Sequence, residues 1–199
     1  MQDLSDGLAR FRRDVFPAKA GLFARLATTH RPTTLFIGCS DARVVPELIT
    51  QSEPGELFVV RTAGNLVPAH ASDPDGIAAS IEYAVAVLHV SDIVICGHSA
   101  CGAMTALAEG HDLSAAPVVS GWLRHADAAR ARVAAVPAAP GPARVAALVR
   151  ANVAAQLQNL TTHPSVARAL TDGTLTLHGW VFDIATGRVD PVDGAAVAA

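Results

Sequence analysis

Two short stretches of the chain carry the residue types of a metal centre. One is Cys39-Ser40-Asp41-Ala42-Arg43, and the other places His98 three positions before Cys101. Two cysteines and one histidine form a common catalytic zinc set, which leaves a fourth position for water or substrate. Cys101 also precedes an expected helix, whose N-terminus favours a thiolate. A His-x-x-Cys pair on its own is more often a buried thiol beside an unrelated histidine, so the hypothesis depends on Cys39 joining the pair.

Asp41 and Arg43 add acid–base character beside Cys39. In an extended segment, residues two apart face the same side, so the two side chains can meet. A carboxylate beside the open position of a metal can accept a proton or a hydrogen bond there, and a guanidinium can hold that carboxylate. The alternative is an ordinary surface ion pair. The third cysteine, Cys96, lies inside an apolar run and is expected to be an inert core residue.

Length and composition indicate which classes of protein this chain can belong to. A chain of 199 residues suits one domain, which we expect to span 1–199 with a helical arm at 1–30. The net charge of −3 gives no support for a nucleic-acid or membrane partner. No apolar run approaches the roughly 20 residues of a membrane span, and the N-terminus lacks a signal-peptide core. Three cysteines fit a reducing compartment better than a disulfide framework, so we expect a cytoplasmic protein.

Apolar runs alternate with helical patterns along the chain. Buried strands are expected at 34–38, 57–61 and 92–98, helices at 4–16, 17–29, 45–51, 73–89, 115–136, 145–160 and 165–170, and an edge hairpin at 175–184 with 187–189. Asp73 is expected to cap the 73–89 helix, with Pro74 at its first position. This order predicts an α/β fold with a mainly parallel sheet flanked by helices. Such sheets place ligand sites beyond the carboxyl ends of their strands, so the segments that begin at Cys39, Arg61 and His98 should meet at one edge.

Several blocks of the sequence resemble the β-class carbonic anhydrases, in the same order and spacing. They are Cys39–Arg43, Glu56–Asn65, Ser80–Val85 and Gly97–Met104, and Leu177–Trp180 with Asp183 and Gly187 extends the match toward the C-terminus. The resemblance implies Zn2+ on Cys39, His98 and Cys101 and the reversible hydration of carbon dioxide to bicarbonate and a proton. Asp41 would orient the zinc-bound hydroxide or accept its proton, and Arg43 would hold Asp41. In the family the Asp can instead rotate onto zinc in a closed, inactive form.

The same resemblance implies substrate contacts and an assembly. Gly102 would offer a backbone N–H to a bound anion at a helix N-terminus. Phe58 and Tyr83 would line a narrow apolar pocket across a subunit interface, although ordinary core packing is the alternative for both. The family forms homodimers and homotetramers, in which the N-terminal helices typically embrace the partner subunit. Two other functions stay open at this point: a carbon disulfide or carbonyl sulfide hydrolase on the same fold, and a non-catalytic zinc protein that senses anions.

The chain departs from the family pattern at a few positions. Ala42 and Thr62 stand where serine and asparagine are commoner, and His30 stands where many members carry a pocket glutamine. Family members that are inhibited by bicarbonate carry a Trp at the position of Phe36 and a Tyr at the position of Phe182. Because neither phenylalanine can donate a side-chain hydrogen bond, we expect the bicarbonate-inhibition site to be absent or weak.

Overall fold

The computed structural model of the protein describes residues 3–73, 75–135 and 141–192. The chain divides into two compact units, Met1–Arg31 and Pro32–Ala199. In the first unit, α1 (Leu4–Arg10) passes through a π-helical turn, η1 (Phe11–Val15), into α2 (Phe16–Leu26). The predicted helices are therefore present, although α2 ends three residues before the expected Thr29. The rings of Phe11, Phe16 and Phe23 pack together with centroids 5.4 to 6.1 Å apart.

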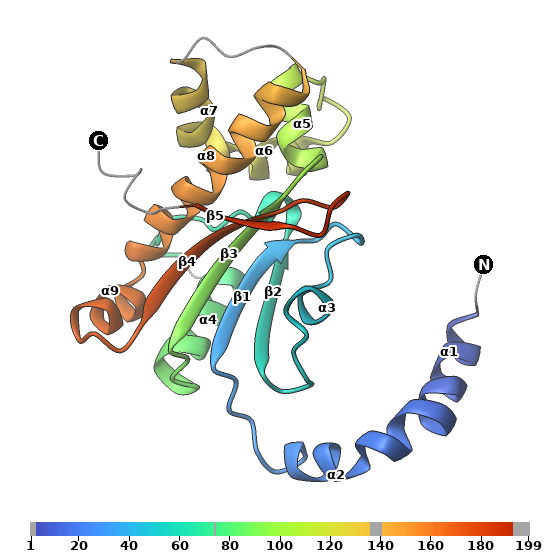
Figure 1. The fold of residues 1–199 in the computed structure, drawn as a ribbon. Helices are drawn as coiled ribbons and strands as arrows, with labels where there is room; N and C mark the ends of the chain where they lie inside the picture. The colour runs from blue at the N-terminus through green and yellow to red at the C-terminus, as the bar shows by residue number, and fades with distance from the viewer. Residues whose placement is uncertain (1–2, 74, 136–140, 193–199) are drawn as a thin grey trace. The chain divides into compact units, whose positions relative to one another are not determined.

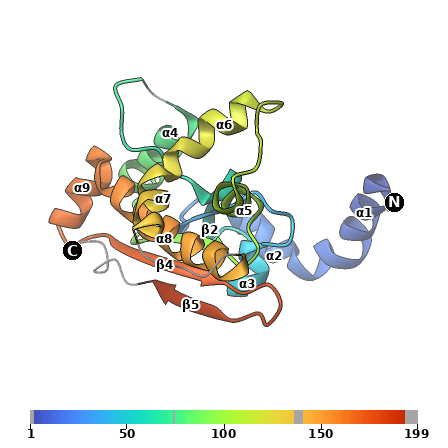
Figure 2. The same ribbon diagram turned by 90° about the horizontal axis from the view of Figure 1, so that it is seen from above.

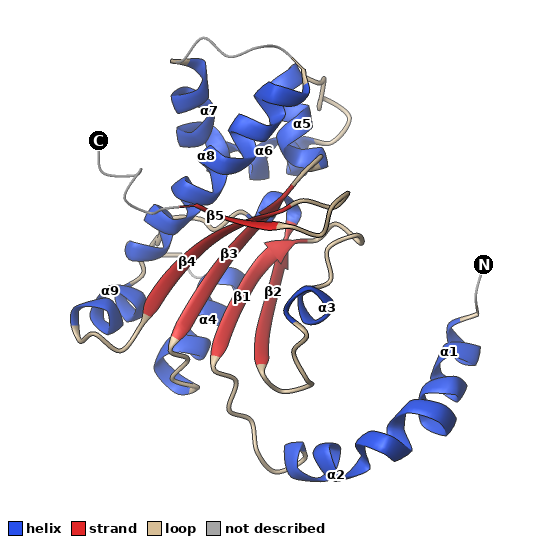
Figure 3. Cartoon of the chain, in the orientation of Figure 1, coloured by secondary structure: helices blue, strands red, loops and turns tan. Residues whose placement is uncertain are grey.

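In the described part of the second unit, five strands form one sheet in the order β2-β1-β3-β4-β5 (Figures 1 and 3). They are β1 (Thr34–Cys39), β2 (Leu57–Thr62), β3 (Asp92–His98), β4 (Thr176–Phe182) and β5 (Val189–Val192). The first four run parallel to one another, and β5 runs antiparallel to β4 at the edge. This confirms the predicted mainly parallel α/β sheet with a C-terminal hairpin.

Helices follow the strands in the order that the sequence pattern indicates. They are α3 (Pro46–Thr50), α4 (Gly76–Glu82) with the π-helical turn η3 (Tyr83–Val87), α5 (Gly102–Glu109), α6 (Pro117–Leu123), α7 (Asp127–Ala134), α8 (Pro142–Thr161) and α9 (Pro164–Thr171). In Figure 2, α4 and α8 lie on the same side of the sheet. None of the helices in the described ranges combines the length and apolarity needed to cross a membrane.

Two local predictions are wrong. Asp75 rather than Asp73 caps α4, because Asp75 Oδ1 accepts from the N–H groups of Ile77 at 2.7 Å and Ala78 at 2.8 Å; Pro74 lies outside the described residues. The expected helix at 115–136 is divided into α6, a 3₁₀ turn η4 (Arg124–Ala126) and α7, and its last residue also lies outside the described ranges. Gln156 of α8 donates to the His125 carbonyl at 3.2 Å, so a tertiary hydrogen bond takes up a carbonyl at the break.

The central strands are buried on both faces. Leu35 and Ile37 of β1 pack toward α4 and α8, whereas Phe36 points to the opposite face and joins Val94 and Cys96. This alternation follows from the period of two in a strand. Burial raises the pKa of Cys96 to about 12, so this thiol stays protonated at neutral pH and is the inert core residue expected.

The approach of α8 and β5 to β4 depends on Gly179. A Cβ at this position would lie 2.7 Å from the Val192 carbonyl oxygen and 2.9 Å from Leu157 Cδ1. We predict that Gly179→Ala lowers the free energy of unfolding by about 1–3 kcal/mol, because the backbone of β5 has little room to move away. The midpoint of denaturant unfolding measures this change.

Gly121 in α6 provides the control, since an added Cβ there has no described atom within 4 Å. Gly121→Ala should leave the protein equally stable or stabilise it by roughly 0.5–1 kcal/mol. Equal midpoints for Gly179→Ala and the unmutated protein would contradict the close approach.

Candidate metal centre

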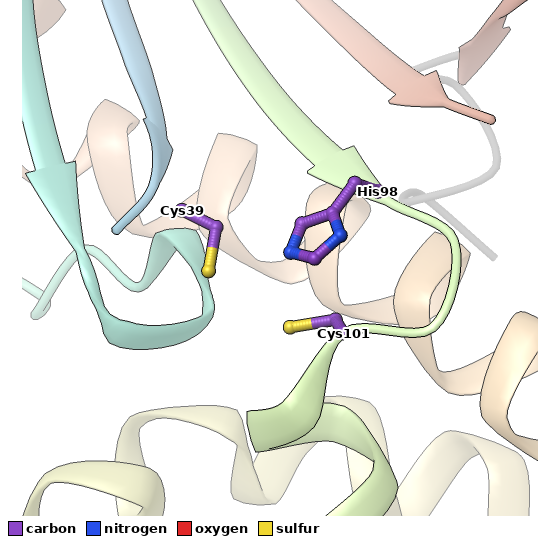
Figure 4. A group of neighbouring side chains, drawn as sticks. All are labelled: Cys39, His98 and Cys101. Carbon is purple, nitrogen blue, oxygen red and sulfur yellow. The ribbon is translucent and has the colours of Figure 1, made fainter. Parts of the chain in front are cut away.

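Three side chains converge where β1 and β3 end. Cys39 is the last residue of β1, His98 is the last residue of β3, and Cys101 is the residue that precedes α5. One potential ligand atom from each lies within 4.8 Å of the other two. Figure 4 shows the three side chains pointing toward one another. The two strands are parallel neighbours, so their carboxyl ends meet at one edge as predicted. All three residues are buried.

The turn between His98 and Cys101 is held in an unusual conformation. Ala100 has a φ of 52°, in the left-handed region that costs a non-glycine residue about 1 kcal/mol. Hydrogen bonds to the end of β4 support it, because the Ser99 N–H donates to the Phe182 carbonyl at 2.9 Å. Ser99 Oγ in turn accepts from the N–H of Ile184 at 2.9 Å. The turn therefore presents both ligands from a fixed backbone.

His98 is oriented toward the two sulfurs with one nitrogen unsatisfied. Its Nδ1 lies 2.9 Å from the Ser99 carbonyl oxygen, which can only accept, so Nδ1 carries the proton. Nε2 is fully buried and has no hydrogen-bond partner among the described residues. A buried imidazole nitrogen with a free lone pair is costly unless something occupies it. Metal-binding histidines have this arrangement, in which the other nitrogen donates to a carbonyl or carboxylate.

The two sulfurs share negative charge. The neighbouring Cys101 thiol, against the opposing effect of burial, lowers the pKa of Cys39 to about 4, and His98 and the backbone N–H groups of Asp41 and Gly64 lower it further. The same contact raises the pKa of Cys101, because a second thiolate would lie beside the first. A bound cation removes that conflict, since coordinating thiols lose their protons outright. The two sulfurs and the unpartnered nitrogen therefore fit a metal ion.

Asp41 and Arg43 pair closely, though not through the extended segment that we expected. They lie in a turn, in which the Val44 N–H donates to the Asp41 carbonyl at 3.0 Å. Arg43 donates to Asp41 Oδ1 from its backbone N–H at 3.0 Å and from Nε at 2.9 Å, and to Oδ2 from Nη2 at 2.7 Å. The guanidinium holds the pKa of Asp41 well below its usual range, so the carboxylate is ionised at neutral pH. Ala42 is exposed in this turn.

The Asp41–Arg43 pair also connects the two segments that carry the candidate ligands. Arg43 Nη2 donates to the Ala100 carbonyl at 3.1 Å, which links the loop after β1 to the turn after β3. Asp41 Oδ2 lies 3.8 Å from the unpartnered His98 Nε2. An acceptor-only carboxylate therefore lies at the edge of the three candidate ligands.

Comparisons with known proteins agree with this geometry. A family model described as "Carbonic anhydrase" matches residues 34–189. The chain belongs to the carbonic anhydrase family. It is 60% identical to the carbonic anhydrase of Pseudomonas aeruginosa, over 98% of this chain and 89% of that relative. It is 56% identical to carbonic anhydrase 1 of Escherichia coli O157:H7, again over 98% of this chain and 89% of the relative.

Solved structures identify the class within the family. The β-carbonic anhydrase CcaA superposes with a TM-score of 0.92 at 41% identity, covering 98% of this chain and 96% of that one. One of two tetrameric β-carbonic anhydrases from Sordaria macrospora superposes with a TM-score of 0.81 at 32% identity, covering 95% and 94%. The resemblance to β-class carbonic anhydrases is thus confirmed, and the protein is an enzyme of that family.

In this carbonic anhydrase, buried amides of α8 support the site, although the sequence pattern did not predict this role. Asn152 and Gln156 are fully buried. Asn152 donates to the Gly64 carbonyl at 2.9 Å, and Gln156 Oε1 accepts from the Val67 N–H at 2.9 Å. They hold the loop after β2, in which the Gly64 backbone N–H helps to lower the pKa of the Cys39 thiol. The available signal was a pair of amides four residues apart within a predicted apolar helix.

The predicted pocket residues lie in different places. Gly102 begins α5 beside Cys101, where its N–H is at the helix N-terminus. Phe58 and Tyr83 form an aromatic pair with ring centroids 5.9 Å apart. Phe58 pairs in register with Leu35, near the start of the strands, whereas Thr62 is the partner of Cys39. Within one chain, the aromatic pair is therefore separated from the three candidate ligands along the strands.

Two other departures from the family pattern can be placed. The Thr62 hydroxyl donates to the Leu66 carbonyl at 2.9 Å, so this threonine braces the loop after β2 rather than reaching the candidate ligands. His30 belongs to the first unit of the chain.

We predict that the protein binds a divalent metal ion with its three candidate ligands. Cys39→Ser and Cys101→Ser should lose most of the metal, because the remaining donors cannot complete the set. Elemental analysis of desalted protein measures the metal bound per chain.

Cys96→Ala is the matched control, since Cys96 is a buried cysteine that does not belong to the candidate ligand group. This variant should retain the metal. Metal retained in Cys39→Ser, or lost in a folded Cys96→Ala protein, would contradict the assignment.

Proposed function

We propose that the protein catalyses the zinc-dependent, reversible hydration of carbon dioxide to bicarbonate and a proton. The observation that carries this proposal is the unpartnered His98 Nε2 beside two sulfurs, with an ionised carboxylate at the edge of the group. Three protein ligands are typical of catalytic zinc sites, which keep a position for water or substrate. Membership of the carbonic anhydrase family supports the same reaction.

Zinc is the ion that this donor set favours. Cys39, Cys101 and His98 would hold it, and two sulfurs with one nitrogen suit a borderline-soft ion rather than magnesium or calcium. When bound, zinc supplies hydroxide at neutral pH for attack on carbon dioxide.

Asp41 and Arg43 have complementary roles in this proposal. Because Asp41 is ionised, it can only accept hydrogen bonds, so it orients a nucleophile that carries a hydrogen atom or takes up its proton. Arg43 holds both carboxylate oxygens and keeps Asp41 in place. Rotation of Asp41 onto the metal would break these contacts, which supports an open state as the working form. Gly102 would offer its N–H to the anionic product at the N-terminus of α5.

An assembly of copies would complete the substrate pocket. Phe58 and Tyr83 are separated from the ligands within one chain, and Tyr83 is 44% exposed, so we propose that a second copy brings them to the site. The Sordaria macrospora relative is described as tetrameric, which supports a homodimer or homotetramer here.

We propose one domain over 1–199, in which residues 1–30 act as an arm toward a partner copy. Buried cysteine thiols without disulfides support a cytoplasmic location.

The other two functions are not favoured. Two relatives that match over 98% of this chain are carbonic anhydrases by name, rather than hydrolases of carbon disulfide or carbonyl sulfide. A non-catalytic zinc protein that senses anions has no use for a carboxylate held ionised at the edge of the metal ligands.

We predict that Asp41→Asn lowers kcat for carbon dioxide hydration by about 10²–10⁴-fold while zinc stays bound, because the amide is a much weaker proton acceptor. Stopped-flow measurement with a pH indicator gives the rate. Asp92→Asn is the control: Asp92 is also a paired carboxylate, 2.7 Å from His178 Nε2, but it lies at the start of β3. Equal rates for Asp41→Asn and the unmutated enzyme would contradict the role of Asp41.

We also predict that bicarbonate does not switch the enzyme off. Phe36 is fully buried, and Phe182 packs in the same apolar cluster, so neither offers a donor to an anion. Initial rates of hydration with added bicarbonate should show simple product competition. Cooperative inactivation, or bicarbonate found beside Phe36 with Asp41 on the metal, would show that the inhibitory site survives.

A further inference from the structure

The side chain of Arg61 contacts the loop that carries Asp41 along its whole length. Arg61 lies near the end of β2, and its Nε donates to the Cys39 carbonyl at 3.0 Å. Its Nη2 donates to the Asp41 carbonyl at 2.6 Å and to the Val44 carbonyl at 2.7 Å. One guanidinium therefore binds the backbone of the 39–44 segment at its beginning, its middle and its end.

This segment leaves the sheet at the point where the chemistry begins. Cys39 is still in register with Thr62 of β2, and the Ser40 N–H donates to the Thr62 carbonyl at 3.0 Å. Beyond Ser40 the chain turns, and its carbonyls need other donors. Arg61 supplies charged donors, which make stronger hydrogen bonds than neutral ones.

Arg61 and Arg43 divide the positioning of Asp41 between them. Arg43 binds the two carboxylate oxygens, whereas Arg61 binds the main-chain carbonyl of the same residue. The carboxylate can be aligned with His98 Nε2 only if the backbone from which it projects is also held. The same side chain holds the carbonyl of Cys39, so the sulfur and the carboxylate share one support.

We propose that Arg61 is a positioning residue for the hydration reaction, acting on Asp41 through the backbone of the 39–44 segment. The inference rests on the proposed function. It requires the planar fork of arginine, because two of its nitrogens serve three carbonyls in fixed directions. A lysine ammonium keeps the charge but cannot reproduce that geometry.

The first test compares Arg61→Met and Arg61→Lys with the unmutated enzyme. Both should lower kcat/KM by about 10–100-fold, the usual effect of removing a residue that orients metal ligands. The loss should appear in kcat rather than KM, since substrate contacts remain. Arg150→Met is the matched control: Arg150 Nη2 donates to the Pro191 carbonyl at 3.0 Å, between α8 and β5, and its loss should leave kcat/KM unchanged.

A double-mutant cycle separates positioning from a general loss of structure. If Arg61 acts through Asp41, Arg61→Met should change the residual rate of Asp41→Ala by less than about 2-fold, because the group it positions is already gone. The same 10–100-fold loss in both backgrounds would overturn the inference. So would a full rate in Arg61→Met.

Amide hydrogen exchange gives a readout independent of activity. In Arg61→Met, exchange at 40–45 should accelerate while α8 is unchanged, whereas unchanged exchange at 40–45 would overturn the inference. If the unmutated, zinc-loaded protein were inactive, the proposed function would fail instead. The exchange measurement would still decide whether Arg61 holds the segment.

Discussion

The structure depends on one electrostatic constraint, which is the placement of two sulfurs and an imidazole nitrogen within 4.8 Å of each other in a buried site. Without a cation, two thiolates cannot coexist at this distance, and the opposite shifts in the pKa of Cys39 and Cys101 express that conflict. The unpartnered Nε2 of His98 adds a second cost of the same kind. A metal ion removes both costs together, which is why these residues are better explained as ligands than as core.

The fold holds the two sulfurs and the imidazole nitrogen at one edge of the sheet. Parallel neighbours β1 and β3 bring Cys39 and His98 to one edge, and the turn after β3 adds Cys101. Loops at that edge lack the regular hydrogen bonds of the sheet, so long side chains support them from outside. Arg43 links the loop after β1 to the turn after β3, Arg61 binds the loop after β1, and the buried amides of α8 bind the loop after β2. The loop that carries Asp41 is therefore held both at its backbone and at its carboxylate.

Patterns that repeat along the chain could be predicted, and contacts between distant segments could not. The strands, their convergence and the candidate ligands followed from apolar runs and residue types. The turn at Asp41–Arg43 was wrongly expected to be extended, because the carbonyls that shape it bind Arg61, twenty residues away in sequence. The break at 124–126 depends similarly on Gln156. The cap of α4 was misplaced by two residues because Asp73 and Asp75 are both good capping residues, and only the helix start distinguishes them. The pocket roles of Phe58 and Tyr83 remain predictions, since they require a second copy.

The central claim is that the metal keeps an open working position beside Asp41. X-ray absorption at the zinc edge of the purified enzyme, at mildly alkaline pH, tests it most directly. We predict two sulfur scatterers at about 2.3 Å and two lighter atoms at about 2.0–2.1 Å, one of them histidine nitrogen. The spectrum should be the same in Asp41→Ala, because Asp41 does not bind the metal in the open state. A third sulfur ligand, or a light atom that is lost with the Asp41 carboxylate, would contradict the claim.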